Sequence, residues 1–462
     1  MNPVRMSRLA AETSGRLFGE DVLFNSVSTD TRSLHTGQLF VALKGPSFDG
    51  NLFVEDAMLR GAAGALVQRR AECDLAQVQV ADTRAALGSF ARYWRGQFDI
   101  PVIGITGSNG KTTIKEMTAS ILRRRGPVLA TRGNLNNDIG VPVTLLEISQ
   151  ENIAAVIELG ANHPGEIGYL ANIAMPDIGV VSNAGPAHLE GFGSIEGVAR
   201  AKGELFAALG PAGAAVLNAD DRFAPLWRSI IGRRQCVSFG LSDAADLQAS
   251  HIEQYVADSG IETRFRLIGK AGECLISMPF AGQHNVRNAL AAAAAAWSAG
   301  ASLEDIRDGL AAAATVAGRL QIRRTAAGAT LIDDTYNANP GSLVAALQVQ
   351  KSMPGKAWLV LGDMGELGEE SAARHAEMGE FSRIQGVTRL FATGEMARHA
   401  VAAFGSGAQW FPDSDALSAE LERELAGDVV VLIKASRAMH FERIVNALSG
   451  SGHSPRRQAN GG

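Results

Sequence analysis

The run VIGITGSNGKTTIKE at residues 102–116 combines residue types that bind phosphate. Its apolar start predicts a strand and its end predicts a helix, while glycines in between let backbone N–H groups face an anion. Lys111 adds positive charge for the β- and γ-phosphates of a nucleotide, and Thr112 offers a hydroxyl to Mg²⁺. The run therefore predicts an ATP or GTP site, whose candidate residues are Gly107, Ser108, Asn109, Gly110, Lys111, Thr112 and Thr113.

The glycine spacing in this run differs from that of the common phosphate-binding loop. Five residues separate Gly104 from Gly110, where the usual motif has four, and Ile105 stands at the expected glycine position. An ordinary strand-to-helix turn is the alternative interpretation.

Three further residues carry groups that could act on a nucleotide. Glu158 ends the apolar run AAVIELG, where a carboxylate can associate with Mg²⁺ or be an ordinary charge at a strand end. His188 lies in the glycine-rich segment NAGPAHLEGFGS. The sequence is equally consistent with a metal ligand and with a structural residue at this position. Lys202 opens a predicted helix, AKGELFAAL, and taken alone is expected to be a solvated lysine.

Two asparagines mark the start of another predicted helix, in FAGQHNVRNALAA. Asn285 and Asn288 are three residues apart and so share one helix face. Their amides can recognise a purine edge, although N-capping of the helix would explain one of them.

Polar loops follow three predicted strands near the carboxyl terminus. Because the carboxyl ends of parallel strands meet at one edge of a sheet, these loops predict a second binding surface, for carboxylates and ribose hydroxyls. Its residues are Asp333, Asp334, Tyr336, Asn337, Asn339, Asp363, Glu366, Lys434, Ser436 and Arg437.

The amino-terminal region has a polar cluster of its own. Hydroxyls, a guanidinium and an ammonium lie near an aromatic residue, Phe48, which suits a nucleotide diphosphate as well as an ordinary surface loop. The candidate residues are Ser28, Thr29, Asp30, Arg32 and Lys44.

These residues are set in alternating strand and helix patterns, which predict an α/β protein with mainly parallel sheets. We expect a small α/β domain at 1–99, a phosphate-loop domain at 100–316 and a doubly wound, Rossmann-like domain at 317–450, followed by a disordered tail at 451–462. Short strand-like runs between Cys236 and Pro279 predict an antiparallel edge.

Composition narrows the classes of function. The 462 residues are 46% hydrophobic and 20% charged with a net charge of -5, which gives no basic footprint for nucleic acid. The three cysteines are far apart, which argues against a disulfide framework or a zinc site. No apolar run is long enough to span a bilayer, so we expect a cytoplasmic protein without membrane insertion.

Six motifs, taken together and in this order, resemble the Mur ligase family: TGSNGKTT, ELGAN, AHLEGFGS, KGEL, GQHNVRNALAA and DDTYNANP. The resemblance implies a three-domain, ATP- and Mg²⁺-dependent enzyme that forms amide bonds in peptidoglycan precursors. Within the family, the segments DTRSLHTGQLFVALKGPSFDG, DDTYNANP and LGDMGELG are most similar to members whose substrates are UDP-N-acetylmuramoyl-tripeptide and D-Ala-D-Ala. The implied intermediate is an acyl phosphate. A family ligase for other substrates, such as one similar to folylpolyglutamate synthase, and a non-catalytic nucleotide-binding scaffold are the alternatives.

The resemblance also implies roles for individual residues. Glu158 and His188 would hold metal with Thr112, and Lys202 matches a lysine that the family carbamoylates into a further metal ligand. Asn285 and Asn288 would approach adenine, Arg319 and Asp334 would contact phosphate and ribose, and the amino-terminal cluster would bind the UDP end. Residues expected near the substrates are Asn137, Lys434, Ser436 and Arg437. The resemblance also implies hinges near Ile100 and Ala317 that let the domains close around the ligands. The protein is expected to be a monomer.

Overall fold

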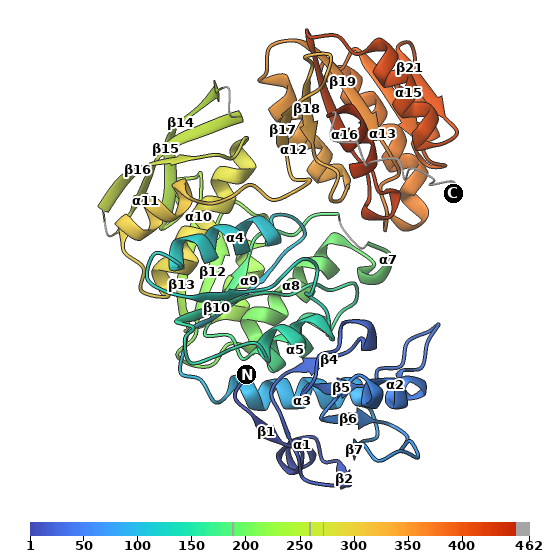
Figure 1. Cartoon of the computed structure of the whole chain (residues 1–462). Coiled ribbons are helices and arrows are strands. Elements are labelled where there is room, and N and C mark those ends of the chain that lie inside the picture. Colours follow the sequence, from blue (N-terminus) through green and yellow to red (C-terminus); the bar gives the residue numbers. More distant parts are fainter. Residues whose placement is uncertain (187–188, 258–259, 271, 450–462) are drawn as a thin grey trace, which may run out of the picture.

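The computed structural model describes residues 1–186, 189–257, 260–270 and 272–449. Within these residues the chain forms three units in sequence order, each built on one large sheet (Figure 1). The sheets are mainly parallel and carry helices, which confirms the predicted α/β class.

The amino-terminal unit contains a five-stranded sheet in the order β2-β7-β6-β5-β4. All neighbours are parallel except β2 and β7. A two-stranded pair, β1 with β3, lies beside this sheet in the same unit. The elements are β1 Val4–Arg5, α1 Met6–Glu12, β2 Arg16–Phe18, β3 Leu23–Phe24, β4 Val27–Ser28, η1 Thr31–Ser33, β5 Leu39–Val41, η2 Gly50–Phe53, α2 Val54–Leu59, β6 Gly64–Val67, β7 Ala76–Gln79 and α3 Thr83–Arg95.

The central unit contains a nine-stranded sheet in the order β16-β15-β14-β13-β12-β11-β8-β10-β9. Its elements are β8 Val102–Thr106, α4 Lys111–Leu122, β9 Val128–Ala130, α5 Gly140–Leu145, β10 Ala154–Glu158, α6 Glu166–Ala174, β11 Ile178–Val181, α7 Leu189–Phe192, α8 Ile195–Ala208, β12 Ala214–Asn218, α9 Ala224–Ile231, β13 Gln235–Gly240, β14 Leu247–Ala257, β15 Gly260–Gly269, β16 Gly272–Met278, α10 Gln283–Ser298 and α11 Leu303–Ala311. Strand β8, which leads into the phosphate loop, lies inside the parallel part between β10 and β11.

The antiparallel edge is smaller than the sequence predicted. β13, which contains Cys236, pairs in parallel with both β12 and β14, and the antiparallel pairs are β14 with β15 and β15 with β16.

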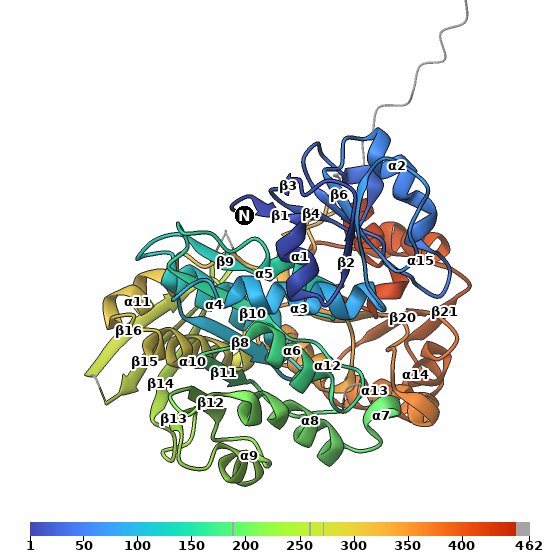
Figure 2. The ribbon, with the colours of Figure 1, turned by 90° about the horizontal axis from the view of Figure 1, so that it is seen from below.

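Both faces of the central sheet are covered, because alternate side chains of each strand point to opposite sides. In β10, Ala155 and Ile157 join the core that includes α6 and α8, while Ala154 and Val156 join the core that includes α4 and α10. The first of these cores continues into the amino-terminal unit through α3, which crosses the central unit beside α5 and α6 (Figure 2).

The carboxyl-terminal unit contains a six-stranded sheet in the order β17-β18-β22-β19-β20-β21, in which only β17 is antiparallel to its neighbour. Its elements are β17 Gln321–Arg324, β18 Thr330–Asp333, α12 Pro340–Lys351, β19 Lys356–Leu361, η3 Gly368–Glu370, α13 Ser371–Ile384, β20 Arg389–Thr393, α14 Ala397–Phe404, β21 Ala408–Phe411, α15 Ser414–Glu424, β22 Val429–Lys434, η4 Arg437–Met439 and α16 Glu442–Leu448. The predicted tail at 451–462 lies outside the described residues. None of the described helices is both long and apolar enough to cross a membrane.

Candidate active site

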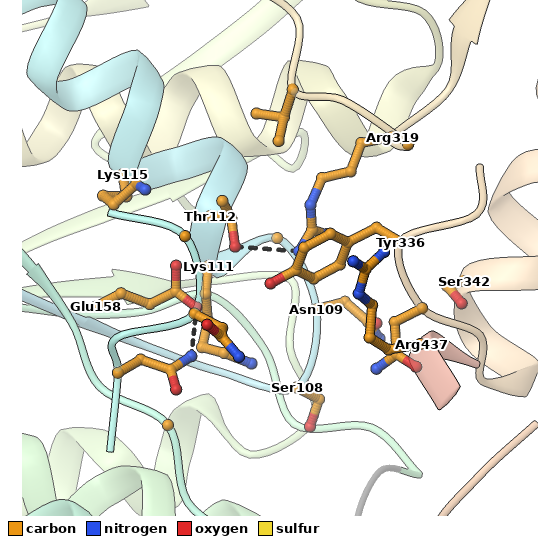
Figure 3. Close-up of a pocket in the computed structure, with 18 of the residues that line it drawn as sticks. Ser108, Asn109, Lys111, Thr112, Lys115, Glu158, Arg319, Tyr336, Ser342 and Arg437 are labelled. Atoms are coloured by element: carbon orange, nitrogen blue, oxygen red, sulfur yellow. Dashed lines mark hydrogen bonds between the residues drawn. The ribbon is translucent and has the colours of Figure 1, made fainter. Parts of the chain in front are cut away.

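A cavity of about 1200 Å³ lies where the three units meet. The carboxyl ends of β8, β10, β18 and β22 reach it, which is the edge where parallel sheets bind ligands. Figure 3 shows side chains of the central and carboxyl-terminal units facing each other across it. Its lining includes Arg84, Ser108, Asn109, Gly110, Lys111, Thr112, Asn136, Asn137, Asp138, Glu158, Tyr169, Arg319, Arg323, Asp334, Tyr336, Asn337, Asn339, Lys434 and Arg437.

The phosphate loop joins β8 to α4 and needs glycine at two positions. Gly107 and Gly110 have positive φ angles of 145° and 85°, which side chains rarely adopt. A Cβ at Gly107 would also collide with Ser182, and one at Gly110 would collide with Asn288. The loop backbone is thus packed tightly where it leads into α4, whose first turn can bind phosphate through its N–H groups.

The end of β11 holds this loop in place. Asn183 accepts a hydrogen bond from the Asn109 N–H at 3.0 Å, and the Ser182 hydroxyl donates to the Asn109 carbonyl at 2.6 Å. Lys111 donates from Nζ to the Gly107 carbonyl at 2.7 Å, across the mouth of the loop. Burial lowers the pKa of Lys111, while the nearby Glu158 carboxylate opposes that shift.

Glu158 lies at the carboxyl end of β10 and is 2% exposed. Its Oε1 accepts a hydrogen bond from Asn136 at 2.9 Å, whereas Oε2 is buried without a hydrogen-bond partner among the described residues. A buried carboxylate oxygen without a donor is unfavourable unless a cation satisfies it. This atom therefore fits the Mg²⁺ that the sequence predicts beside Thr112.

Lys202 is buried, contrary to the expectation of a solvated lysine. Its side chain is 1% exposed in α8, and its Nζ lies 5.4 Å from the centre of the Phe192 ring. Burial, together with the positive charge of Lys111, lowers the pKa of Lys202 to about 7. A substantial fraction of this amine is therefore neutral near pH 7.

The predicted metal set is only partly visible. His188 lies outside the described residues, so its position relative to Glu158 and Lys202 is not part of the structure. No group of three His, Cys, Asp or Glu side chains able to hold a metal occurs in the part of the chain that is described. The candidate ligands that are described, Thr112, Glu158 and Lys202, use a hydroxyl, one carboxylate and a lysine instead.

Among the described residues, two hydrogen bonds connect the carboxyl-terminal unit to the phosphate loop. Arg319 donates to the Thr112 hydroxyl at 3.0 Å and stacks 4.2 Å from the ring centre of Tyr336 (Figure 3). The Asn339 amide donates to the Asn109 side-chain oxygen at 2.9 Å. The four predicted residues that these bonds join, two from each unit, therefore lie at one site.

Two other predicted residues of this unit, Asp334 and Asn337, contact Lys434. This lysine is 1% exposed and donates from Nζ to Asp334 and to the Asn337 carbonyl. Arg437 lines the cavity, whereas Ser436 is fixed by a backbone bond from its N–H to the Asp363 carbonyl at 2.9 Å. Asn137, on the opposite wall, accepts from the Gly140 N–H at 2.8 Å.

A second cavity, of about 260 Å³, adjoins the phosphate loop and the start of α10. Thr113, Asn285 and Asn288 line it, so the predicted adenine residues lie beside the predicted phosphate residues. Neither asparagine caps α10, since Gly282 is at the N-cap. The Asn285 amide instead donates to the Ala281 carbonyl at 2.8 Å, and Asn288 donates to Asn285 at 3.0 Å.

The amino-terminal cluster lies outside the 1200 Å³ cavity. Ser28 ends β4, and Thr29, Asp30 and Arg32 follow it. Lys44 follows β5, which is parallel to β4 and so ends at the same edge. Asp30 accepts from Arg32 at 2.7 Å, and this hydrogen bond lowers the pKa of Asp30 to about 2. The cluster forms a polar edge on the amino-terminal unit.

Several lining residues were not singled out from the sequence. His284 lines the smaller cavity, where burial lowers its pKa to about 4. Arg84, Asp138 and Tyr169 line the larger cavity and come from α3, the loop before α5, and α6. His284 belongs to the motif FAGQHNVRNALAA. No local sequence pattern indicated that Arg84, Asp138 or Tyr169 would line a cavity.

Comparison with known proteins assigns this fold and site to a family. The family model for the Mur ligase middle domain matches residues 105–296, and that for the Mur ligase glutamate ligase domain matches residues 318–437. The UDP-N-acetylmuramoyl-tripeptide--D-alanyl-D-alanine ligase of Escherichia coli K12 is 44% identical over 98% of this chain and 100% of its own.

Solved structures agree with this relationship. A UDP-N-acetylmuramoylalanyl-D-glutamyl-2,6-diaminopimelate--D-alanyl-D-alanyl ligase from Acinetobacter baumannii superposes with a TM-score of 0.87 at 37% identity, covering 97% of this chain and 98% of that one. A MurF ligase from Thermotoga maritima in complex with ADP has a TM-score of 0.82 at 28% identity, covering 92% and 97%.

The fold and the site thus define an ATP-dependent peptide ligase that uses Mg²⁺. The chain belongs to the Mur ligase family.

Proposed function

We propose that this chain joins D-Ala-D-Ala to UDP-N-acetylmuramoyl-tripeptide, with ATP converted to ADP and phosphate, and so makes the pentapeptide precursor of peptidoglycan. The observation that carries this proposal is the 1200 Å³ cavity, which Arg84, the phosphate loop and the loops after β18 and β22 line together. A site that three units build in common can bring a UDP-linked peptide, a nucleotide and a dipeptide together.

The proposal takes over the division into 1–99, 100–316 and 317–450 that the sequence predicts. In this proposal the amino-terminal unit binds the UDP end through Ser28, Thr29, Asp30, Arg32 and Lys44, whose polar edge suits a diphosphate. The carboxyl-terminal unit binds D-Ala-D-Ala, with Lys434 and Arg437 as its cations near the peptide. A cytoplasmic monomer fits the nature of these substrates.

The central unit positions ATP for transfer of its γ-phosphate to the tripeptide carboxylate. The N–H groups of the first turn of α4 and the Lys111 ammonium hold the phosphates, while Asn285 and Asn288 lie where adenine would enter the smaller cavity. Mg²⁺ held by Thr112 and Glu158 would neutralise phosphate charge. Arg319 approaches the same threonine from the other side of the cavity and adds a cation there.

Lys202 fits the family's carbamoylated lysine on chemical grounds. Carbamate formation requires a neutral amine that attacks CO₂ and loses a proton, and the lowered pKa of about 7 supplies that amine. The product would be an anion in place of a cation, next to Lys111. With Glu158 and His188 it would complete a set of ligands for a second Mg²⁺.

The test is phosphate release with purified protein, ATP, Mg²⁺, UDP-N-acetylmuramoyl-tripeptide and D-Ala-D-Ala. We expect release that depends on both substrates, together with a UDP-linked pentapeptide identified by mass spectrometry. Release without the dipeptide, or a product with another amine, would assign the chain to a different ligation. The absence of any ligation would favour a nucleotide-binding scaffold.

Lys111→Ala supplies the matching control. Without the ammonium we expect turnover to fall at least about 100-fold, because charge neutralisation dominates phosphoryl transfer. Binding of the UDP-linked tripeptide, measured by calorimetry, should remain because its UDP end binds in another unit. Loss of both would indicate a misfolded variant.

A further inference from the structure

Arg84 and Asp138 form a pair of opposite charges on the wall of the 1200 Å³ cavity. Arg84 Nη1 donates to Asp138 Oδ2 at 2.8 Å, and the two side chains are 41% and 34% exposed. The pair therefore remains accessible from the cavity. It joins α3 of the amino-terminal unit to the loop before α5 of the central unit.

This pair lies between the two places that a UDP-linked peptide must connect. Next to Arg84, the Thr83 hydroxyl donates to the Ala42 carbonyl at 3.0 Å, which fixes the start of α3 beside the polar edge that includes Lys44. On the other side, Asp138 is two residues from Asn136, whose amide bonds to Glu158 at 2.9 Å. Two residues of chain span at most about 7 Å. The pair is thus close to the reacting end of the peptide.

Tyr169 adds a hydroxyl to the same wall. It lies on α6, lines the cavity and is 41% exposed. Its hydroxyl oxygen is 3.0 Å from the position that a Cβ would take at Gly88, one turn along α3 from Arg84. Burial and the carboxylates of Asp138 and Asp82 raise the pKa of Tyr169, so its phenol stays protonated and can donate.

The charges on this wall are selective. Among the described lining residues that come from α3, the 133–138 loop and the 160–170 segment, Arg84 is the one cation, and Asp138 and Glu166 are the acids. A side chain that ends in an ammonium alone could pair with Asp138 or Glu166, but it would offer no carboxylate to the Arg84 guanidinium. One ending in both an ammonium and a carboxylate matches Asp138 and Arg84 together.

We propose that Arg84, Asp138 and Tyr169 bind the zwitterionic end of a diaminopimelate side chain at the third position of the tripeptide and thereby select it over lysine. The proposal rests on the proposed ligation, since it names the substrate of that site. Arg84 and Tyr169 hold the distal carboxylate through charge-assisted hydrogen bonds, and Asp138 holds the distal ammonium.

The experiment compares UDP-N-acetylmuramoyl-tripeptides that carry meso-diaminopimelate or lysine, each with ATP and D-Ala-D-Ala. The wild-type protein is expected to prefer the diaminopimelate peptide. Arg84→Met should reduce that preference by about 10- to 100-fold through a higher KM for this peptide, with the KM for the lysine peptide unchanged or lower. Arg84→Lys should retain part of the preference, and Asp138→Asn should raise the KM for both peptides.

Arg92→Met is the matched control. Arg92 is also exposed on α3 and also donates to the central unit, at the Asn172 carbonyl, but it does not line the cavity. Its replacement should leave the preference unchanged. If Arg84→Met changed the KM for both peptides equally, Arg84 would only connect the two units and the inference would be overturned. A wild-type protein that does not prefer the diaminopimelate peptide would also overturn it. Inactivity of the wild type with both peptides would overturn the proposed ligation as well.

Discussion

The guanidinium of Arg319 donates a hydrogen bond to the hydroxyl of Thr112 at 3.0 Å, although 207 residues separate them in the sequence. Thr112 belongs to the first turn of α4, and Arg319 precedes the first strand of the carboxyl-terminal sheet. The Nε of the same guanidinium is buried without a hydrogen-bond partner among the described residues. The bond therefore places a partly unsatisfied cation against the phosphate loop.

Replacing Arg319 should slow the reaction. We expect Arg319→Ala to lower kcat/KM for ATP by about 100-fold, because one preorganised donor to a reacting oxyanion contributes about that much. Phosphate-release kinetics over a range of ATP concentrations would measure it. Arg324→Ala is the control, since Arg324 bonds to the Gly328 carbonyl and Thr330 within its own unit. An equal loss in both variants would contradict a role for Arg319 in the reaction.

Carbamoylation of Lys202 should depend on pH. The lysine has a pKa of about 7, so its neutral, CO₂-reactive fraction rises as the pH increases through 7 and falls below it. After removal of CO₂, the rate at which added bicarbonate restores activity, corrected for dissolved CO₂, should rise with this pKa and level off above pH 8. Lys202→Ala should be inactive and insensitive to bicarbonate. Wild-type activity of this variant would exclude the carbamate.

Asn339 should affect stability and nucleotide binding separately. Its oxygen caps α12 by accepting from the Ser342 N–H at 2.8 Å, while its amide donates to Asn109 of the phosphate loop. Asn339→Ala should lose about 1 kcal/mol of stability through the cap and also raise the KM for ATP. Asn339→Ser keeps a capping oxygen but cannot reach Asn109, so only the KM should rise, by several-fold.

The control for this prediction is Ser302→Ala, which removes the equivalent cap of α11. It should lower stability without changing the KM.

Small-angle scattering would show whether the units also close, since ATP with both substrates should compact the wild type more than Asn339→Ser. A KM unchanged in Asn339→Ser would rule out a nucleotide-linked role for the bond between the units.

His284 should make the protein less stable in acid. Burial lowers its pKa from 6.5 to about 4, so between these values the unfolded chain binds a proton that the folded chain does not. The free energy of unfolding should therefore fall as the pH drops from about 6.5 to about 4. In urea unfolding, His284→Gln should lose less stability than the wild type over that range. Parallel losses in the two proteins would mean that His284 titrates alike in both states.

Most of the fold could be predicted from the sequence because its signals are local. The apolar run that leads into glycines and Lys111 specified β8, the phosphate loop and α4, and the three-residue spacing of Asn285 and Asn288 placed both on one face of α10. The predicted extent of the antiparallel edge was wrong at β13. Whether a strand run is parallel or antiparallel depends on its neighbour, and the run itself carries no information about it.

The resemblance of several motifs to one family determined the class of reaction and the set of polar loops, since each motif is contiguous in the chain. Only the tertiary structure decided which of those groups meet. The helical sequence around Lys202 predicts a solvated lysine. The side chain is buried instead, because Phe192 and the surrounding core cover it. Two hydrogen-bonded pairs join residues of different units, namely Arg319 with Thr112 and Arg84 with Asp138. Such pairs form only when separate sheets pack together, and a local sequence pattern contains no information about that packing.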